Sequence, residues 1–241
     1  MDNLQFQATV VDKVDGWLNR ITSLRTMDIL RYQEESQIAG SILEIGVFCG
    51  KYFSVLARSA QRTNSRLLGI DTFQWIPESR VQQTLAMSSE TDRVDVRLSK
   101  SFSSEHSPIE LLGLLGARAR FVSVDGSHDS NDVYLDLVLS EQIISSKGMI
   151  AVDDFLNPIA LGVNEAVHKF FARPRLVLPV AYISNKLFLA HRSVAKNYRS
   201  MIEESIIGDT TEPESRNFRE KLAKGRHFVE QSLWGNPLLI S

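Results

Sequence analysis

The sequence is nearly devoid of cysteine. Cys49 is the only one among 241 residues, so no disulfide can form within the chain. A single thiol also cannot build the thiolate cluster of a structural zinc site. The sequence therefore excludes a disulfide-stapled scaffold and a zinc-knuckle module.

An excess of positive charge is missing as well. The formal net charge is −2, which leaves no basic surplus to displace counterions from a nucleic acid. No apolar run approaches the roughly 20 residues that a membrane helix needs, and the first residues lack the basic and apolar regions of a signal peptide. We therefore expect a cytoplasmic protein with neither a nucleic-acid nor a membrane partner.

The most informative stretch that is present runs from Ser41 to Tyr52. It predicts a buried strand, a turn that contains Gly46 and Gly50, and then a helix. Glu44 is an acid at the end of this otherwise apolar strand, where it needs a polar partner. A glycine turn after a strand is typical of several folds that bind nucleotide-like cofactors, and is often only structural.

Three further predicted strands also end in acids. Asp71 ends the second strand, Asp125 the fourth, and the pair Asp153 and Asp154 the fifth. The carboxyl ends of parallel strands lie at one edge of a sheet, where open α/β folds bind ligands. Helical segments alternate with these strands, so a right-handed doubly wound sheet is the expected architecture.

The last two predicted strands distinguish the chain from an ordinary dinucleotide-binding domain. Residues 175–183 and 186–190 are separated only by Ser184 and Asn185, which permits an antiparallel hairpin but no parallel crossover. Five parallel strands and this hairpin give a mostly parallel seven-stranded sheet of Rossmann-like α/β class.

Segments outside the sheet are expected to be helical. We predict an N-terminal helical extension over residues 1–40, broken near Thr22 and Ser23, a core over 41–192, and a C-terminal helical extension over 193–241. The extensions could be lids, dimer arms or both, so a homo-oligomer formed through terminal helices is one expectation.

With the glycine turn, Asp71 and the terminal hairpin together, the chain resembles a class I S-adenosylmethionine-dependent methyltransferase. The segment Glu44–Tyr52 is similar to the cofactor loop of catechol-type metal-dependent O-methyltransferases. Residues 71–78 and 148–155 resemble the macrocin-type sugar O-methyltransferases of antibiotic pathways. The resemblance covers roughly residues 40–190 and leaves both ends uncovered.

The resemblance implies a set of cofactor contacts. The backbone from Gly46 to Gly50 would pass under the methionine part of S-adenosylmethionine. Glu44 would support the loop or the amino group, Asp71 would hold the ribose, and Ser101, with its neighbour Phe102, would lie near the adenine. Asp125 shares this edge and is counted among the cofactor contacts.

The acids after the fourth and fifth strands indicate a metal site. Asp125, Asp153 and Asp154 would meet at neighbouring strand ends, where uncompensated carboxylates repel one another. Mg²⁺ or another hard divalent cation with oxygen ligands would relieve this repulsion. The alternative is that some of these acids cap helices or face solvent.

His128 is the candidate catalytic base, three residues after Asp125. A neutral imidazole can take a proton from a hydroxyl group. Catechol-type enzymes carry a lysine at this offset, and a histidine here resembles the macrocin-type enzymes more closely. The alternative is an ordinary loop histidine.

The resulting hypothesis is an S-adenosylmethionine-dependent, divalent-metal-assisted O-methyltransferase acting on a small hydroxylated acceptor, such as a sugar or another natural product. One alternative is a metal-independent methyltransferase of the same fold. Others are an NAD-dependent oxidoreductase, favoured by the glycine turn and Asp71, and a non-catalytic binding protein.

Overall fold

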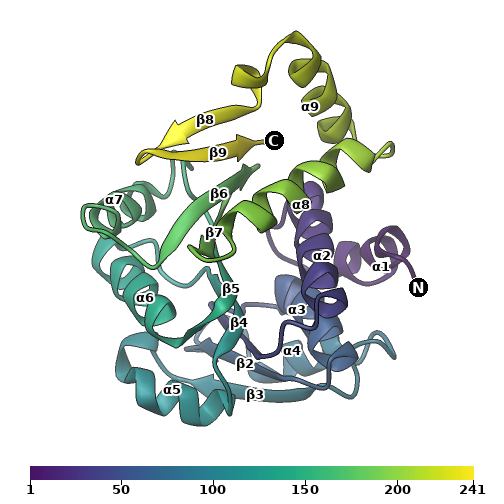
Figure 1. Ribbon diagram of the computed structural model, residues 1–241. Helices are drawn as coiled ribbons and strands as arrows, with labels where there is room; N and C mark the ends of the chain where they lie inside the picture. The colour runs from purple at the N-terminus through teal and green to yellow at the C-terminus, as the bar shows by residue number, and fades with distance from the viewer.

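A nine-stranded mixed sheet runs through the computed structural model, which describes all 241 residues (Figure 1). The strand order is β3-β2-β1-β4-β5-β7-β6-β9-β8. Strands β1 to β5 pair in parallel, whereas β7 is antiparallel to both β5 and β6. The strands are β1 Ser41–Ile45, β2 Arg66–Asp71, β3 Asp95–Lys100, β4 Ala119–Val124, β5 Ile144–Val152, β6 Val177–Ile183, β7 Lys186–His191, β8 Glu230–Leu233 and β9 Asn236–Ile240.

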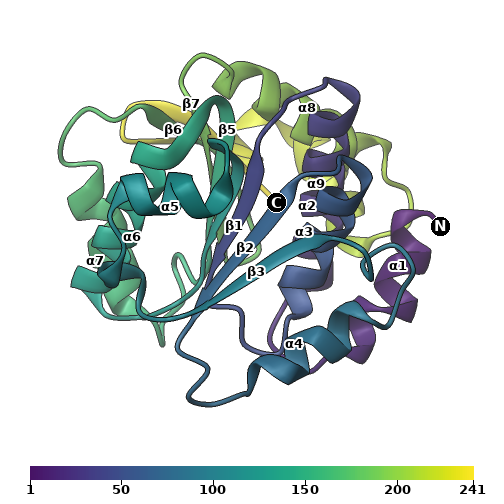
Figure 2. The same cartoon turned by 90° about the horizontal axis from the view of Figure 1, so that it is seen from below.

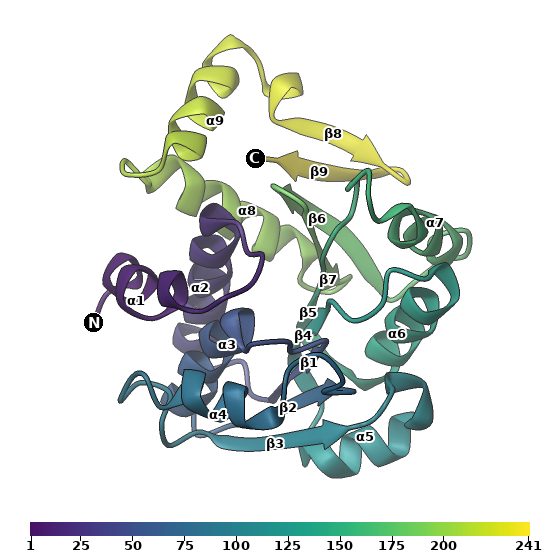
Figure 3. The same cartoon turned by 180° about the vertical axis from the view of Figure 1, so that it is seen from behind.

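Helices cover both faces of this sheet (Figures 2 and 3). Helices α2, α3, α4 and α8 pack on one face, and α5, α6 and α7 pack on the other. None of the helices has the length and apolar character needed to cross a membrane. The helices are α1 Asn3–Thr9, α2 Arg20–Glu35, α3 Lys51–Arg62, α4 Glu78–Leu85, α5 Pro108–Leu115, α6 Ser130–Ile143, α7 Leu161–Phe170, α8 Ala195–Gly208 and α9 Pro213–Lys224, with 3₁₀ turns at Val11–Lys13, Ser103–Glu105 and Arg226–Phe228.

Burial on both faces explains why the central strands are apolar throughout. Ile42 of β1 packs among the α2 and α3 side chains, while its neighbour Leu43 packs among those of α5 and α6. A parallel strand covered on both sides needs apolar residues at every position rather than at every second one. The doubly wound architecture with the hairpin of β6 and β7 is thereby confirmed.

The predicted strand number of seven is wrong, because residues 230–240 add the hairpin of β8 and β9. The C-terminal extension is therefore not wholly helical. Trp234 and Gly235 form the two-residue turn, with φ of +49° and +73°. Strand β9 then runs parallel to β6, and the Trp234 ring stacks on Phe171 with centroids 4.2 Å apart. The paired strands, which Figure 1 shows, and the stacked indole together hold the C-terminal segment against the body.

The N-terminal helical segment breaks earlier than predicted. Thr22 and Ser23 lie inside α2 and are buried, whereas the break spans residues 10–19. A helical threonine is tolerated here because its hydroxyl has a partner outside the helix: Thr22 Oγ1 donates to the carbonyl of Ile183, 3.3 Å away in β6. The segment is thus fixed to the sheet by α2.

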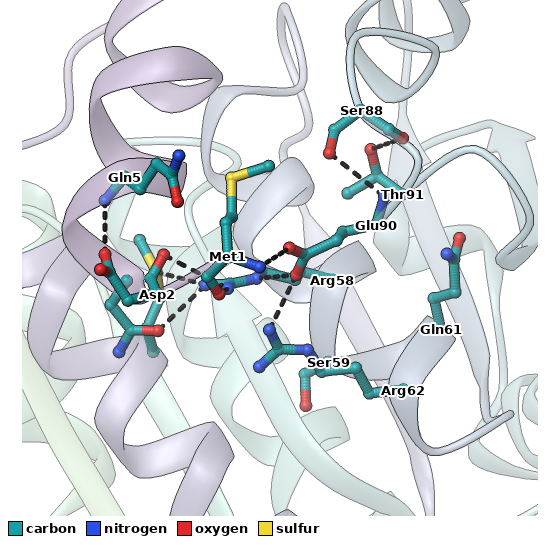
Figure 4. A network of polar contacts seen from close by, with 12 residues as sticks. Met1, Asp2, Gln5, Arg58, Ser59, Gln61, Arg62, Ser88, Glu90 and Thr91 are labelled. Atoms are coloured by element: carbon teal, nitrogen blue, oxygen red, sulfur yellow. Dashed lines mark hydrogen bonds and ion pairs between the residues drawn. The ribbon is translucent and has the colours of Figure 1, made fainter.

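A network of charges attaches the N-terminal residues to α3 and to the loop after α4 (Figure 4). Glu90 accepts hydrogen bonds from the Met1 ammonium at 2.7 Å and from Arg58 Nε at 2.6 Å. Arg62 adds a third contact at 2.7 Å. Burial opposes ionisation of Glu90, but these donors outweigh it and lower its pKa to about 2.

Replacing Glu90 with Gln should reduce the free energy of unfolding at pH 7 by roughly 2 kcal/mol, after allowance for solvent screening. The folded-state pKa lies below the ordinary value of 4.5, so the carboxylate stabilises the fold above pH 4.5 and loses that effect as pH falls toward about 2. Urea unfolding at pH 7 and pH 3 should show the difference between wild type and Glu90→Gln shrinking. Glu220→Gln, at an exposed position of α9, is the control; a difference that grows on acidification contradicts the assignment.

Candidate active site

The carboxyl ends of the parallel strands bring the predicted acids to one edge of the sheet. Glu44 lies near the end of β1, Asp71 ends β2, and Asp125 and Asp153 directly follow β4 and β5. Strand β1 pairs with β2 and β4, and β4 pairs with β5, so these ends are neighbours. The edge is the one at which open α/β sheets bind ligands.

A tight turn leaves β1 at this edge. Gly46 has φ of +86°, and a Cβ atom there would lie 1.9 Å from the carbonyl oxygen of Asp125. Only glycine combines this conformation with so close a backbone approach. Gly50 has φ of +81° and is the N-cap residue just before α3. The turn therefore lies directly against the chain as it leaves β4.

Asp71 holds this turn in place. One carboxylate oxygen, Oδ2, accepts the amide protons of Val47 at 2.8 Å and Phe48 at 2.9 Å. The other, Oδ1, accepts the amide proton of Phe73 at 2.7 Å. Both oxygens of Asp71 thus already bind backbone, and the predicted contact with a ribose stays a prediction.

A lysine, Lys186, is buried among the acids. It is the first residue of β7, and the next residue, Leu187, pairs with Val152 in antiparallel register, so Lys186 falls beside Asp153. Its Nζ lies 3.2 Å from Asp153 Oδ2, and the side chain is 1% exposed. The same Nζ lies 4.4 Å from the centre of the Tyr52 ring. We call Glu44, Asp125, Asp153 and Lys186 the acid–lysine cluster.

Burial dominates the electrostatics of this cluster. It raises the pKa of Glu44 well above the ordinary range, and Lys186 opposes the rise. Loss of hydration and the adjacent Asp153 carboxylate raise the pKa of Asp125, and Lys186 opposes the rise. Burial alone would lower the pKa of Lys186, but the surrounding acids, Asp153 first, hold it above its ordinary value.

The arrangement does not support the predicted metal site. Asp153 pairs with Lys186, whereas Asp154 takes a separate set of partners, so the carboxylates of Asp125, Asp153 and Asp154 do not converge on one point. No group of three histidine, cysteine or acidic side chains is arranged to hold a metal ion. The Lys186 ammonium instead offsets part of the repulsion among the acids.

His128 and Asp154 form a pair at the same edge. His128 Nε2 lies 2.9 Å from Asp154 Oδ2, and the histidine side chain is 50% exposed. The other oxygen of Asp154 accepts hydrogen bonds from Asn157 Nδ2 at 2.7 Å and Asn185 Nδ2 at 3.1 Å. Asp154 itself has φ of +56°, a conformation that these contacts hold in place. The carboxylate thereby orients the imidazole and leaves Nδ1 available.

Residues 14–19, which we call the cover segment, lie over the glycine turn. The Trp17 ring stacks on Phe48 with centroids 5.9 Å apart, and Lys51 Nζ donates to the carbonyl of Gly16 at 3.0 Å. Asn19 Nδ2 donates to Asn185 Oδ1 at 3.1 Å, which links the segment through Asn185 to Asp154. The N-terminal segment is therefore part of the site.

Comparison with protein families gives one match, to a methyltransferase domain, over residues 43–155. This range contains the glycine turn and every predicted site residue. The chain contains a methyltransferase domain. A comparison with curated proteins finds no match.

Several solved structures share the fold of this methyltransferase. CalS11, described as a TDP-rhamnose 3'-O-methyltransferase of calicheamicin biosynthesis, is 19% identical with a TM-score of 0.55, covering 71% of this chain and 80% of its own. The O-methyltransferase NovP is 14% identical with a TM-score of 0.58, covering 70% and 80%. A Podospora anserina methyltransferase with S-adenosylhomocysteine bound is 14% identical with a TM-score of 0.52, covering 73% and 80%.

Ser101, which the resemblance places near the adenine, follows β3 in the methyltransferase. Its Oγ lies 2.8 Å from His106 Nε2, and Phe102 beside it is 56% exposed. The side chains of Ser101 and His106 therefore form a polar site at the edge, beside an exposed aromatic ring. His106 had no predicted role, and its spacing of five residues from Ser101 gave no recognisable signal.

Proposed function

We propose that this methyltransferase transfers a methyl group from S-adenosylmethionine to a hydroxyl oxygen of a small acceptor, with His128 as the base. The observation that carries the proposal is the His128–Asp154 pair at the edge that also holds the glycine turn. Asp154 orients the imidazole through the 2.9 Å contact with Nε2 and so leaves Nδ1 for the acceptor hydroxyl.

The chain offers contacts suited to each part of the donor, which supplies a methyl group on a positively charged sulfur. The glycine turn, from Gly46 to Gly50, gives a close backbone approach for the methionine part. Glu44 Oε2 is buried without a hydrogen-bond partner, which suits it to accept from the α-ammonium group. Asp125 would add a second acidic contact, while Asp71 would act by fixing the turn.

In the proposed methyl transfer, every proton and bond change involves only His128, the acceptor and the donor. His128 Nδ1 takes the proton of the acceptor hydroxyl while Nε2 stays on Asp154. The hydroxyl oxygen forms the new bond to the methyl carbon, and the carbon–sulfur bond breaks with its electron pair left on sulfur. Holding the reacting groups in line supplies much of the rate. Mg²⁺ has no part in this step, because Asp153 pairs with Lys186, and Asp154 pairs with His128 and Asn157.

Exposed aromatic rings favour a ring-bearing or sugar acceptor. Trp17 of the cover segment is 90% exposed, and Trp75, in the loop after β2, is 87% exposed. CalS11, which shares the fold, is a TDP-rhamnose 3'-O-methyltransferase. Sugars and hydroxylated natural products both have faces that pack on an indole, so they form the acceptor class that we propose.

A binding and transfer experiment tests the proposal. Calorimetry should detect S-adenosylhomocysteine and not NAD, and labelled methyl groups should appear on at least one hydroxyl compound from a panel of sugar nucleotides, catechols and hydroxylated natural products. Transfer should persist after dialysis against chelator. Binding of NAD in place of S-adenosylhomocysteine would show the proposal to be wrong, and so would transfer to nitrogen compounds alone.

A further inference from the structure

We propose that the Lys186 ammonium is the resident cation of the acid–lysine cluster and excludes a divalent metal from this edge of the sheet. Lys186 is held from three sides: by Asp153 through the 3.2 Å contact, by Tyr52 beneath it, and by the hairpin turn just before it. Its side chain is almost wholly buried, so it cannot turn out to solvent without opening β7.

Charge and existing contacts both argue against a second cation here. A hard divalent ion needs several oxygen ligands at about 2.0–2.6 Å. The ammonium already lies against Asp153 Oδ2, so an ion bound to that carboxylate would face an adjacent positive charge in a poorly hydrated site. The Asp154 oxygens would have to give up His128 and the two asparagines before they could bind the ion.

Electrostatic attraction, rather than a full set of hydrogen bonds, holds the acid–lysine cluster together. Asp153 Oδ1 and Glu44 Oε2 are buried without partners, and Lys186 Nζ makes no well-directed hydrogen bond. Removing the ammonium would therefore leave acids with free lone pairs and no compensating charge. These carboxylates are not arranged around an ion in the wild-type protein, but without the ammonium they would be free to turn toward one. Lys186 is thus the contact that holds Asp153 away from a metal-binding arrangement.

Manganese binding tests this inference directly. Electron paramagnetic resonance of Mn²⁺ should show no bound ion in the wild-type protein, and about one per chain in Lys186→Ala, with at least a tenfold gain in affinity. Adding Asp153→Asn to that variant should abolish the binding. Lys224→Ala, at an exposed position of α9, is the matched control and should behave as wild type.

Three results would overturn the inference: tight Mn²⁺ binding by wild type, Lys186→Ala binding no better than wild type, or a gain that survives Asp153→Asn. Lys186→Met keeps the volume of the side chain and replaces Lys186→Ala should that variant not fold, as judged by circular dichroism. If both variants unfold, the Mn²⁺ measurement on the wild-type protein still tests the inference, because tight binding there contradicts it. The readout is metal binding and not methyl transfer, so its failure is distinct from failure of the proposed function.

Discussion

Replacing His128 with Ala should lower the rate of methyl transfer by about 10²–10⁴-fold, the usual contribution of a general base. The side chain is half-exposed and contacts Asp154, so its loss leaves the core intact. Affinity for S-adenosylhomocysteine should change by less than about twofold, because the glycine turn and Glu44 belong to other elements. Single-turnover transfer and calorimetry on the same preparation separate the two effects.

Asp154 acts as a positioning residue, and its variants give the control for this prediction. Asp154→Asn keeps the size of the side chain but replaces the carboxylate that orients the imidazole through Nε2, so kcat should fall while KM for the donor stays the same. Asp154→Glu should recover part of the rate, and His227→Ala, at an exposed position, should have none of these effects. Full activity of His128→Ala would refute the assigned base.

Replacing Gly46 with Ala should both destabilise the fold and abolish donor binding. The new Cβ would lie 1.9 Å from the Asp125 carbonyl oxygen, at φ of +86°. Relief requires moving the turn away from β4, which costs about 2–4 kcal/mol when the steric and conformational contributions are combined. The same movement displaces the backbone that would approach the donor. Affinity for S-adenosylhomocysteine should fall more than about tenfold.

The matched control for Gly46 is Gly113 in α5. A Cβ atom there meets nothing within 4 Å, so Gly113→Ala should stabilise the helix by up to about 1 kcal/mol and leave donor binding unchanged. Thermal melts and calorimetry on both variants are the measurements. Normal donor binding by Gly46→Ala would mean that the donor does not approach this turn.

Much of the fold could be predicted because it depends on local patterns. The apolar strands that end in acids predicted the parallel core. The two-residue connection at Ser184 and Asn185 predicted the antiparallel hairpin at its end. The hairpin of β8 and β9 escaped prediction because its strands are short, and β9 contains Pro237, which is unfavourable in a strand interior. Its position depends on pairing with β6, a contact distant in sequence.

The site was predicted less completely than the fold, because the role of each acid depends on which side chain it contacts. Counting carboxylates at strand ends suggested a metal, and the cation opposite them came from β7, across the sheet. The register of the hairpin contains that information: once Leu187 pairs with Val152, Lys186 must lie beside Asp153. The orientation of Asp154 toward His128 depends instead on a positive φ that no sequence pattern indicated.

The two outer strands of the sheet affect how copies of this protein can meet. Strand β8 is four residues long and mostly polar, while β3 at the opposite edge carries Asp95, Arg97 and Lys100. Short and charged edges resist pairing with a strand from another molecule. The sheet is therefore closed to extension at both ends, which protects a nine-stranded sheet against edge-to-edge aggregation. We therefore expect contacts between copies to avoid these two strands.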